Sequence, residues 1–207
     1  MNTLADGNTH FTEWTITVVG KIEECVENFQ KAVTVNQKNN RAYSNYLFNL
    51  NYLTKYDDNY YIEEAKKFGL SLKKIDDQLC IPYKYNVNPK KLTVGFVSAD
   101  LRNHPVGYYL IDTLKYLKKK NIKLVAYHNS TKTDDLTEKL KKHFDIWYNI
   151  SNENDLSVIN LIRKNGVHIL IDMSGHTKGN RLPIFINKPA PIQATWAGHL
   201  ASTGIPE

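Results

Sequence analysis

The sequence has few cysteines, few arginines and no long apolar run, and each shortage argues against a class of protein. Cys25 and Cys80 show neither the density of a disulfide-stapled secreted domain nor a metal-ligand spacing, so both are expected in a core. No stretch approaches the roughly 20 apolar residues that span a membrane, and the N-terminus lacks the basic and apolar segments of a signal peptide. We therefore expect a cytoplasmic protein without a membrane partner.

Lysine supplies nearly all of the positive charge. Lys and Arg number 27 against 21 Asp and Glu, which gives a net charge of +6, yet only Arg41, Arg102, Arg163 and Arg181 are arginines. Proteins that read duplex bases usually rely on the planar guanidinium for two-point contacts. We therefore expect no nucleic-acid partner and ascribe the charge to a lysine-rich surface.

The length of 207 residues, with 42% hydrophobic and 23% charged residues, is typical of one globular domain or two small ones. Residues 1–80 have the pattern of tetratricopeptide-like helices. Small and aromatic residues recur on one helical face, as in the second helix of such a repeat: Gly20, Cys25, Phe29 and Ala32. Residues 12–19 are rich in β-branched residues and are a poor helix, whereas 41–53 and 61–75 predict two more helices. So few helices cannot bury their faces alone, so we expect them to cap a larger body.

Residues 81–91 contain two prolines and predict a linker, after which the pattern changes. Short apolar runs and amphipathic stretches alternate over residues 92–207. The runs predict strands at 92–98, 122–127, 146–150, 167–172 and 192–195, and the stretches predict helices at 104–120, 134–143, 155–165 and 182–187. This alternation predicts an α/β fold with a Rossmann-like, doubly wound parallel sheet. Ligands of such sheets bind at the carboxyl ends of the strands.

His104 follows the first predicted strand and precedes Pro105, which favours the first turn of a helix. The helix dipole disfavours an imidazolium at that position and leaves a neutral ring that can accept a proton. His104 is therefore a candidate general base; the alternative is a histidine that only caps the helix.

Two later loops combine glycines with polar side chains. Residues 174–181, SGHTKGNR, contain His176, Lys178 and Arg181, and their cations suit an anionic ligand, although a solvated turn is an equal alternative. Residues 196–204, WAGHLASTG, suit a pocket wall or a tight turn that closes the sheet. His143, at the end of a predicted helix, has the simpler interpretation of a C-terminal cation. No histidine pair has zinc spacing, so we expect no metal site.

Three blocks resemble the N-terminal catalytic lobe of the SPINDLY and O-linked N-acetylglucosamine transferase family: LTVGFVSADLRNHPVGYYL, GVHILIDMSGHTKGNRLPIF and KPAPIQATWAGHLASTG. The stretch SNYLFNLNY resembles the helical segment that links the repeats of that family to its catalytic region. The resemblance implies a GT-B glycosyltransferase. Such an enzyme transfers a sugar from a nucleotide diphosphate donor, UDP-N-acetylglucosamine or another nucleotide sugar, to Ser or Thr of a protein or peptide acceptor, without a cofactor.

The resemblance also implies site residues. His104 matches the histidine proposed in the family as a base or as a group that positions the acceptor, and His143 matches a second active-site histidine. The positions that match the sugar-pocket lining are His176, Lys178, Ala197, Gly198 and Leu200. In the family, Tyr-Pro-Gly commonly follows the glycine that matches Gly198. This chain has His199, Leu200 and Ala201 there, which leaves the identity of the transferred sugar open.

The sequence ends at Glu207, before the second lobe that supplies most nucleotide contacts in the family. We therefore expect the chain alone to be half of an active site and inactive. The alternative function is a non-catalytic module whose repeat helices bind a partner peptide while the α/β lobe serves as a scaffold.

Overall fold

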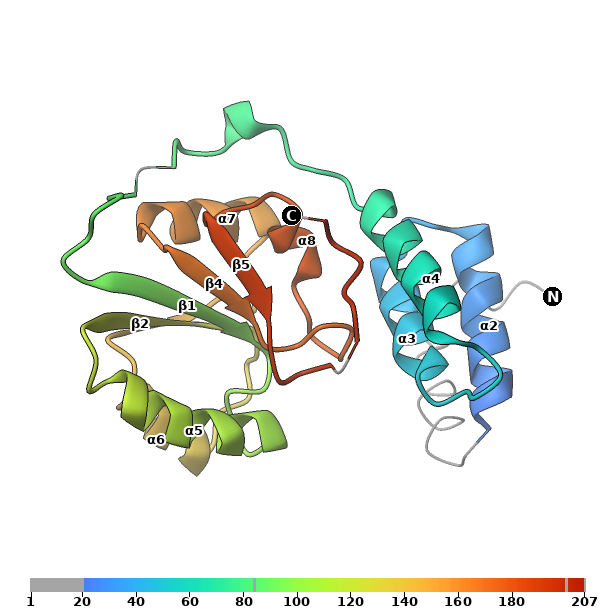
Figure 1. Cartoon of the computed structure of the whole chain (residues 1–207), viewed down its shortest axis with the longest axis horizontal. Helices are drawn as coiled ribbons and strands as arrows, with labels where there is room; N and C mark the ends of the chain where they lie inside the picture. Colours follow the sequence, from blue (N-terminus) through green and yellow to red (C-terminus); the bar gives the residue numbers. More distant parts are fainter. Residues whose placement is uncertain (1–20, 84, 200, 207) are drawn as a thin grey trace. The chain divides into compact units, whose positions relative to one another are not determined.

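The computed structural model describes residues 21–83, 85–199 and 201–206. They form two compact units (Figure 1). The helical unit comprises the described residues up to Leu72 together with Ala201–Pro206. The α/β unit comprises the described residues from Lys73 to His199. The stretch 12–19, predicted to be a poor helix, lies outside the described residues.

Three helices build the helical unit: α2 (Ile22–Val35), α3 (Asn40–Leu50) and α4 (Asp58–Ser71). Side chains fix where α3 and α4 begin, because Asn39 accepts a hydrogen bond from the Ala42 N–H and Asp57 accepts one from the Tyr60 N–H. The Asp57 cap explains why α4 begins at Asp58, three residues before the predicted start at residue 61. The buried side chains between the helices include Cys25, Phe29, Leu47 and Phe68. The tetratricopeptide character of these helices stays a prediction.

The segment Ala201–Pro206 belongs to the helical unit and runs close to α4. The Tyr61 hydroxyl donates a hydrogen bond to the Ser202 carbonyl, 3.0 Å away. Further along α4, Gly69 meets the backbone of Gly204 so closely that a Cβ at either glycine would overlap backbone atoms. Two residues without side chains thus allow an extended segment to lie directly against a helix.

The α/β unit contains the predicted parallel sheet of five strands, in the order β3-β2-β1-β4-β5. The strands are β1 (Leu92–Ser98), β2 (Ile122–His128), β3 (Ile146–Asn149), β4 (Ile169–Asp172) and β5 (Ile192–Thr195). The helices are α5 (Pro105–Leu117), α6 (Asp135–Lys141), α7 (Asp155–Lys164) and α8 (Leu182–Phe185), with a short 3-10 helix, η1 (Asp77–Leu79). Figure 1 shows α5 and α6 on one face of the sheet and α7 and α8 on the other. The predicted doubly wound α/β fold is therefore confirmed.

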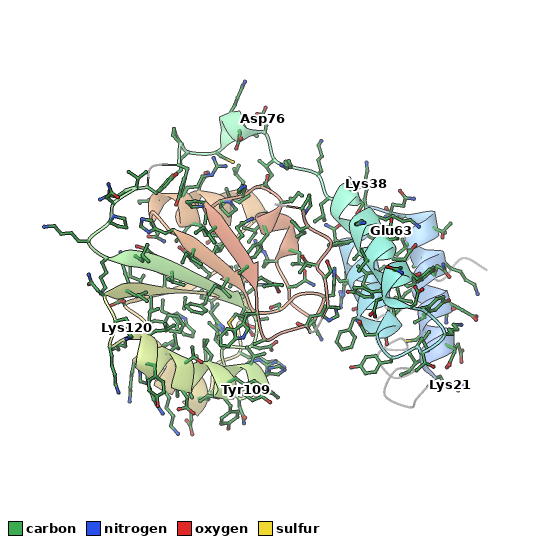
Figure 2. The ribbon with its side chains drawn as sticks, in the orientation of Figure 1. Lys21, Lys38, Glu63, Asp76, Tyr109 and Lys120 are labelled. Atoms are coloured by element: carbon green, nitrogen blue, oxygen red, sulfur yellow. The ribbon has the colours of Figure 1, made fainter. Side chains whose placement is uncertain are left out.

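Burial follows position in the sheet. The central strand β1 is buried from Thr93 to Ser98 because helices cover both of its faces, whereas Ile192 on the edge strand β5 is 57% exposed. Leu110 and Leu114 of α5 pack against β1 and β2 in the core. On the outer face of the same helix, Tyr109 points away from the sheet (Figure 2). Within the part of the chain that the structure describes, no helix is long and apolar enough to cross a membrane.

Polar side chains of the α/β unit hold the segment that precedes β1. Asn160 of α7 accepts a hydrogen bond from the Ile81 N–H at 2.8 Å. Arg163, also on α7, donates to the Asp77 carboxylate at 2.8 Å and to the Ile81 carbonyl at 3.2 Å. The segment from Asp77 to Ile81, at the start of the predicted linker, therefore lies along the surface of the α/β unit, held by side chains of α7.

Candidate active site at the carboxyl edge of the sheet

The loops after β1, β2 and β4 meet at one edge, because neighbouring parallel strands end on the same side. The Asn129 N–H, just after β2, donates to the Ser98 carbonyl at 2.8 Å, and the Asn129 amide donates to the Gly179 carbonyl at 2.8 Å. A Cβ at Gly179 would lie 2.7 Å from the Cβ of Ala99. The sheet topology thus brings three sequence-distant loops into contact.

His104 occupies the position that the sequence predicts, at the start of α5. It is the N-cap residue in an extended conformation, and its Nδ1 accepts a hydrogen bond from the Val106 N–H at 3.3 Å. Its side chain is 38% exposed, so the ring is accessible to a ligand. The His104 side chain therefore caps α5 and is still accessible to a ligand.

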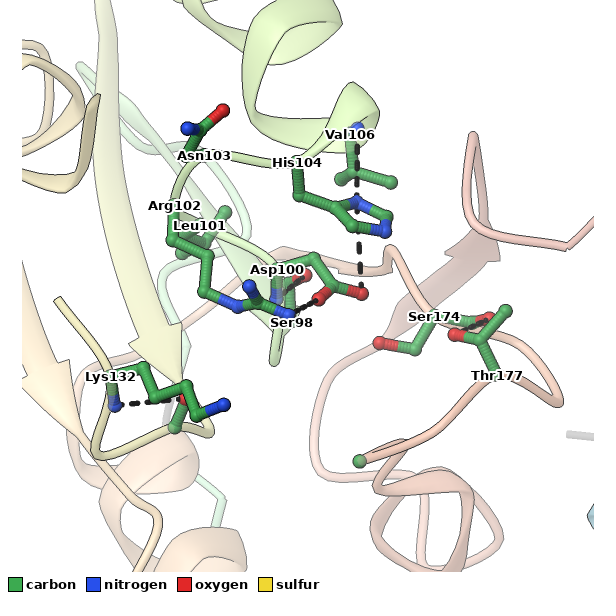
Figure 3. A network of polar contacts seen from close by, with 12 residues as sticks. Ser98, Asp100, Leu101, Arg102, Asn103, His104, Val106, Lys132, Ser174 and Thr177 are labelled. Atoms are coloured by element: carbon green, nitrogen blue, oxygen red, sulfur yellow. Dashed lines mark hydrogen bonds and ion pairs between the residues drawn. The ribbon is translucent and has the colours of Figure 1, made fainter. Parts of the chain in front are cut away.

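A buried carboxylate behind His104 was not found by the sequence analysis. One oxygen of Asp100 accepts a hydrogen bond from Arg102 at 3.0 Å, and the other lies 3.9 Å from His104 Nδ1. The Ser98 hydroxyl accepts a hydrogen bond from the Asp100 N–H and fixes the turn. Figure 3 shows the Asp100 carboxylate between the side chains of Arg102 and His104. The feature of the sequence that could have identified Asp100 is its position two residues after the end of an apolar strand.

Asp172, the last residue of β4, organises the loop that follows it. Its buried carboxylate accepts hydrogen bonds from the Ser174 N–H at 3.1 Å, the Gly175 N–H at 2.7 Å and the Thr195 hydroxyl at 2.9 Å. Burial raises the pKa of this carboxyl group, and the three donors act in the opposite direction. Asp172 thus ties the loop carrying His176 to the end of β5, a role that its place inside a predicted strand did not reveal.

His176, Ala197 and Gly198 lie together in the structure. The ring of His176 is buried and meets the ring of His199 edge to face, with centroids 5.3 Å apart. Gly198 approaches the backbone of Met173 so closely that a Cβ would overlap the Met173 carbonyl. Ala197 adopts a φ of 68°, which is uncommon for a residue with a side chain. Leu200, the last predicted member of this group, lies outside the described residues.

The two cations of the loop after β4 differ in their surroundings. Lys178 is exposed. Arg181 instead points into the unit, where its guanidinium binds the Asp155 carboxylate, the Asn129 side chain and the carbonyls of Ile150 and Glu153. Of the two, Lys178 is therefore the one placed to meet an anionic ligand.

His143 lies at the opposite edge of the sheet from His104. Helix α6 runs from the carboxyl edge back to the amino edge, and two residues after His143 the Asp145 side chain accepts a hydrogen bond from the Leu124 N–H near the start of β2. Burial, followed by the charges of Lys118 and Lys115, lowers the pKa of His143. The structure thus does not bring His143 together with the other predicted residues, and its role in catalysis stays a prediction.

The described residues contain no group of three or more His, Cys, Asp or Glu that could hold a metal ion. The arrangement instead offers an accessible imidazole, an exposed ammonium group and a wall of small residues. These groups suit hydrogen bonding to an oxygen-rich ligand.

Comparison with known proteins identifies the family. The model of glycosyl transferase family 41 matches residues 30–206. The chain belongs to this family. Among family 41 relatives, the probable UDP-N-acetylglucosamine–peptide N-acetylglucosaminyltransferase SPINDLY of Oryza sativa is 31% identical over 186 residues, which cover 87% of this chain and 20% of the relative. The UDP-N-acetylglucosamine–peptide N-acetylglucosaminyltransferase of Caenorhabditis elegans is 30% identical over 119 residues, 56% of this chain and 10% of that protein.

A solved family 41 structure supports the same assignment. A mutant O-GlcNAc transferase of Thermobaculum terrenum superposes with a TM-score of 0.82 at 28% identity, covering 92% of this chain and 36% of that chain. The present chain therefore spans about a fifth of the rice relative and about a third of the bacterial structure. The resemblance inferred from the three sequence blocks is confirmed.

Acidification should destabilise the α/β unit, because burial lowers the pKa of two of its histidines. Burial lowers the pKa of His199 to about 4 and also lowers the pKa of His128. The unfolded chain then binds more protons than the folded one, so the free energy of unfolding should fall as the pH drops from about 6.5 toward 4. Urea unfolding at several pH values measures the fall, which should be smaller in His199→Gln. An equal fall in both proteins would contradict the assignment to His199.

Proposed function

We propose that the chain is part of a protein O-linked N-acetylglucosaminyltransferase, which transfers a sugar from UDP-N-acetylglucosamine or another nucleotide sugar to Ser or Thr hydroxyls of a protein or peptide acceptor. The main support is the family 41 match over residues 30–206, together with homologues named for this transfer. Family membership favours the enzyme over a non-catalytic peptide-binding module.

In this proposal the carboxyl edge of the sheet forms one wall of the active site. His104 contacts the reacting groups, Lys178 meets the negative charge of the donor, and Ala197 and Gly198 line the sugar pocket beside His176. A second lobe of a longer polypeptide supplies the remaining nucleotide contacts, because stabilisation of the leaving diphosphate is a large catalytic contribution. Leu200 and His143 stay predicted members of the site.

A transfer assay tests this function. The full-length gene product that contains this chain is incubated with peptide acceptors and each of several radiolabelled nucleotide sugars, among them UDP-N-acetylglucosamine. Label should enter Ser or Thr side chains from one donor. Nucleotide-sugar binding without transfer to any acceptor would contradict the proposal.

Lys178→Ala should raise the KM for the nucleotide sugar roughly tenfold, because one charge-assisted contact to a diphosphate oxygen is lost. Lys120→Ala is the matched control, since Lys120 is exposed beyond α5 at the amino edge of the sheet. Steady-state kinetics of both variants in the full-length enzyme measure the difference. Equal KM values in the two variants would remove Lys178 from the donor site.

A further inference from the structure

The two ring nitrogens of His104 have different surroundings. Nδ1 faces the Val106 N–H at 3.3 Å and accepts its hydrogen bond. A neutral imidazole has one protonated nitrogen and one bare nitrogen, and only the bare one accepts. The neutral ring that caps α5 therefore carries its proton on Nε2.

The start of α5 maintains this tautomer. Pro105 has no N–H, so the Val106 N–H is the first donor of the helix, and the Val106 residue is buried. A proton on Nδ1 would oppose that N–H and leave it without the cap. The local backbone thus disfavours the other tautomer.

Asp100 does not reverse this preference. In a catalytic triad a carboxylate accepts the Nδ1 proton of the histidine and leaves Nε2 bare to act as a base. Here the nearer Asp100 oxygen is 3.9 Å from Nδ1, beyond hydrogen-bond distance, and the other oxygen is bound to Arg102 at 3.0 Å. The arrangement around His104 is therefore the opposite of that in a triad.

We propose that the His104 Nε2–H donates a hydrogen bond to an oxygen of the nucleotide sugar. In this role His104 is not the base that removes the proton from the hydroxyl group of the acceptor. This role rests on the function proposed above. In the transfer, the acceptor Oγ forms a bond to the anomeric carbon while the bond from that carbon to the diphosphate oxygen breaks. The electron pair leaves on the diphosphate, and the hydroxyl proton passes to water.

Chemistry explains why the nucleotide sugar is the partner. A hydrogen bond to the attacking oxygen would withdraw electron density from the nucleophile, whereas one to the leaving group stabilises the negative charge that develops there. The first turn of α5 adds the positive end of a 13-residue helix at the same place. The role of the Nε2–H as a hydrogen-bond donor to the leaving group thus agrees with the positive potential at the start of α5.

The tautomer can be measured without any enzymatic activity. Long-range proton–nitrogen correlation NMR on the ¹⁵N-labelled 207-residue chain, at a pH where the ring is neutral, identifies the protonated nitrogen. The His104 signals are assigned by their loss in His104→Gln. We expect a protonated Nε2 and a bare Nδ1, both in the wild type and in Asp100→Asn, which keeps an acceptor for Arg102. A proton on Nδ1 that depends on Asp100 would overturn the proposal.

Kinetics of the full-length enzyme test the catalytic part. His104→Gln places an amide donor near the position of Nε2 and should retain kcat within roughly tenfold of the wild type, while His104→Asn and His104→Ala should lose roughly 10²- to 10³-fold. The acidic limb of the pH profile should be the same in the wild type and in His104→Gln. If His104→Gln lacks the acidic limb and is as inactive as His104→Ala, then His104 acts as a base and the proposal is wrong. Absence of transfer from any nucleotide sugar would overturn the proposed function and the catalytic role, while the NMR result would still decide the tautomer.

Discussion

Arg181→Ala should destabilise the α/β unit by roughly 2–4 kcal/mol, because the side chain holds three chain segments together. Its guanidinium donates to the Asp155 carboxylate at 2.7 and 3.0 Å, to the Asn129 side chain at 3.1 Å, and to the Ile150 and Glu153 carbonyls at 3.1 Å. The arginine side chain is only 12% exposed, so the alanine variant leaves partly buried acceptors without their donor. The loop between β4 and α8 should loosen as a result.

Urea unfolding followed by tryptophan fluorescence measures this loss, since Trp147 and Trp196 both lie in the α/β unit. Lys178→Ala is the control, because it removes an exposed cation from the same loop and should leave the midpoint nearly unchanged. Arg181→Lys should lie between the two, since an ammonium group cannot reproduce the fork of contacts. Equal midpoints for Arg181→Ala and Lys178→Ala would contradict the structural role of Arg181.

Gly204→Ala should destabilise the helical unit by about 3 kcal/mol. Gly204 has a φ of 74°, and a Cβ there would overlap the backbone carbonyl of Ala65 in α4. Both the conformational cost and the overlap oppose a side chain, so the segment Ala201–Pro206 should leave α4. Amide hydrogen exchange of this segment, and thermal unfolding of the whole chain, should both report the change.

A second substitution separates the two causes. Asn tolerates a positive φ better than Ala does, but its Cβ meets Ala65 in the same way. If overlap dominates, Gly204→Asn should be nearly as destabilised as Gly204→Ala. Recovery of stability in Gly204→Asn would instead show that the backbone conformation carries most of the cost.

Local sequence features predicted the elements of the α/β unit. The run from Leu92 to Ser98 became the buried central strand because its apolar and small residues are continuous, as a strand covered on both faces requires. Pro105 fixed the start of α5 and so made His104 the cap. These outcomes depend on a few neighbouring residues, which is why the sequence alone determined them, together with the parallel sheet that their alternation implies.

The site depended on contacts between distant residues, and only the tertiary structure decided these. The direction of α6 carried His143 to the amino edge, although the family resemblance matched it to a second active-site histidine. The two cations of the loop after β4 differ in accessibility. Arg181 binds carboxylate and carbonyl groups inside the unit, whereas Lys178 is exposed. Sequence spacing determines which residues share a helix or a loop; which side chain is accessible, and which ring nitrogen keeps its proton, depends on the atoms that packing brings within hydrogen-bond distance.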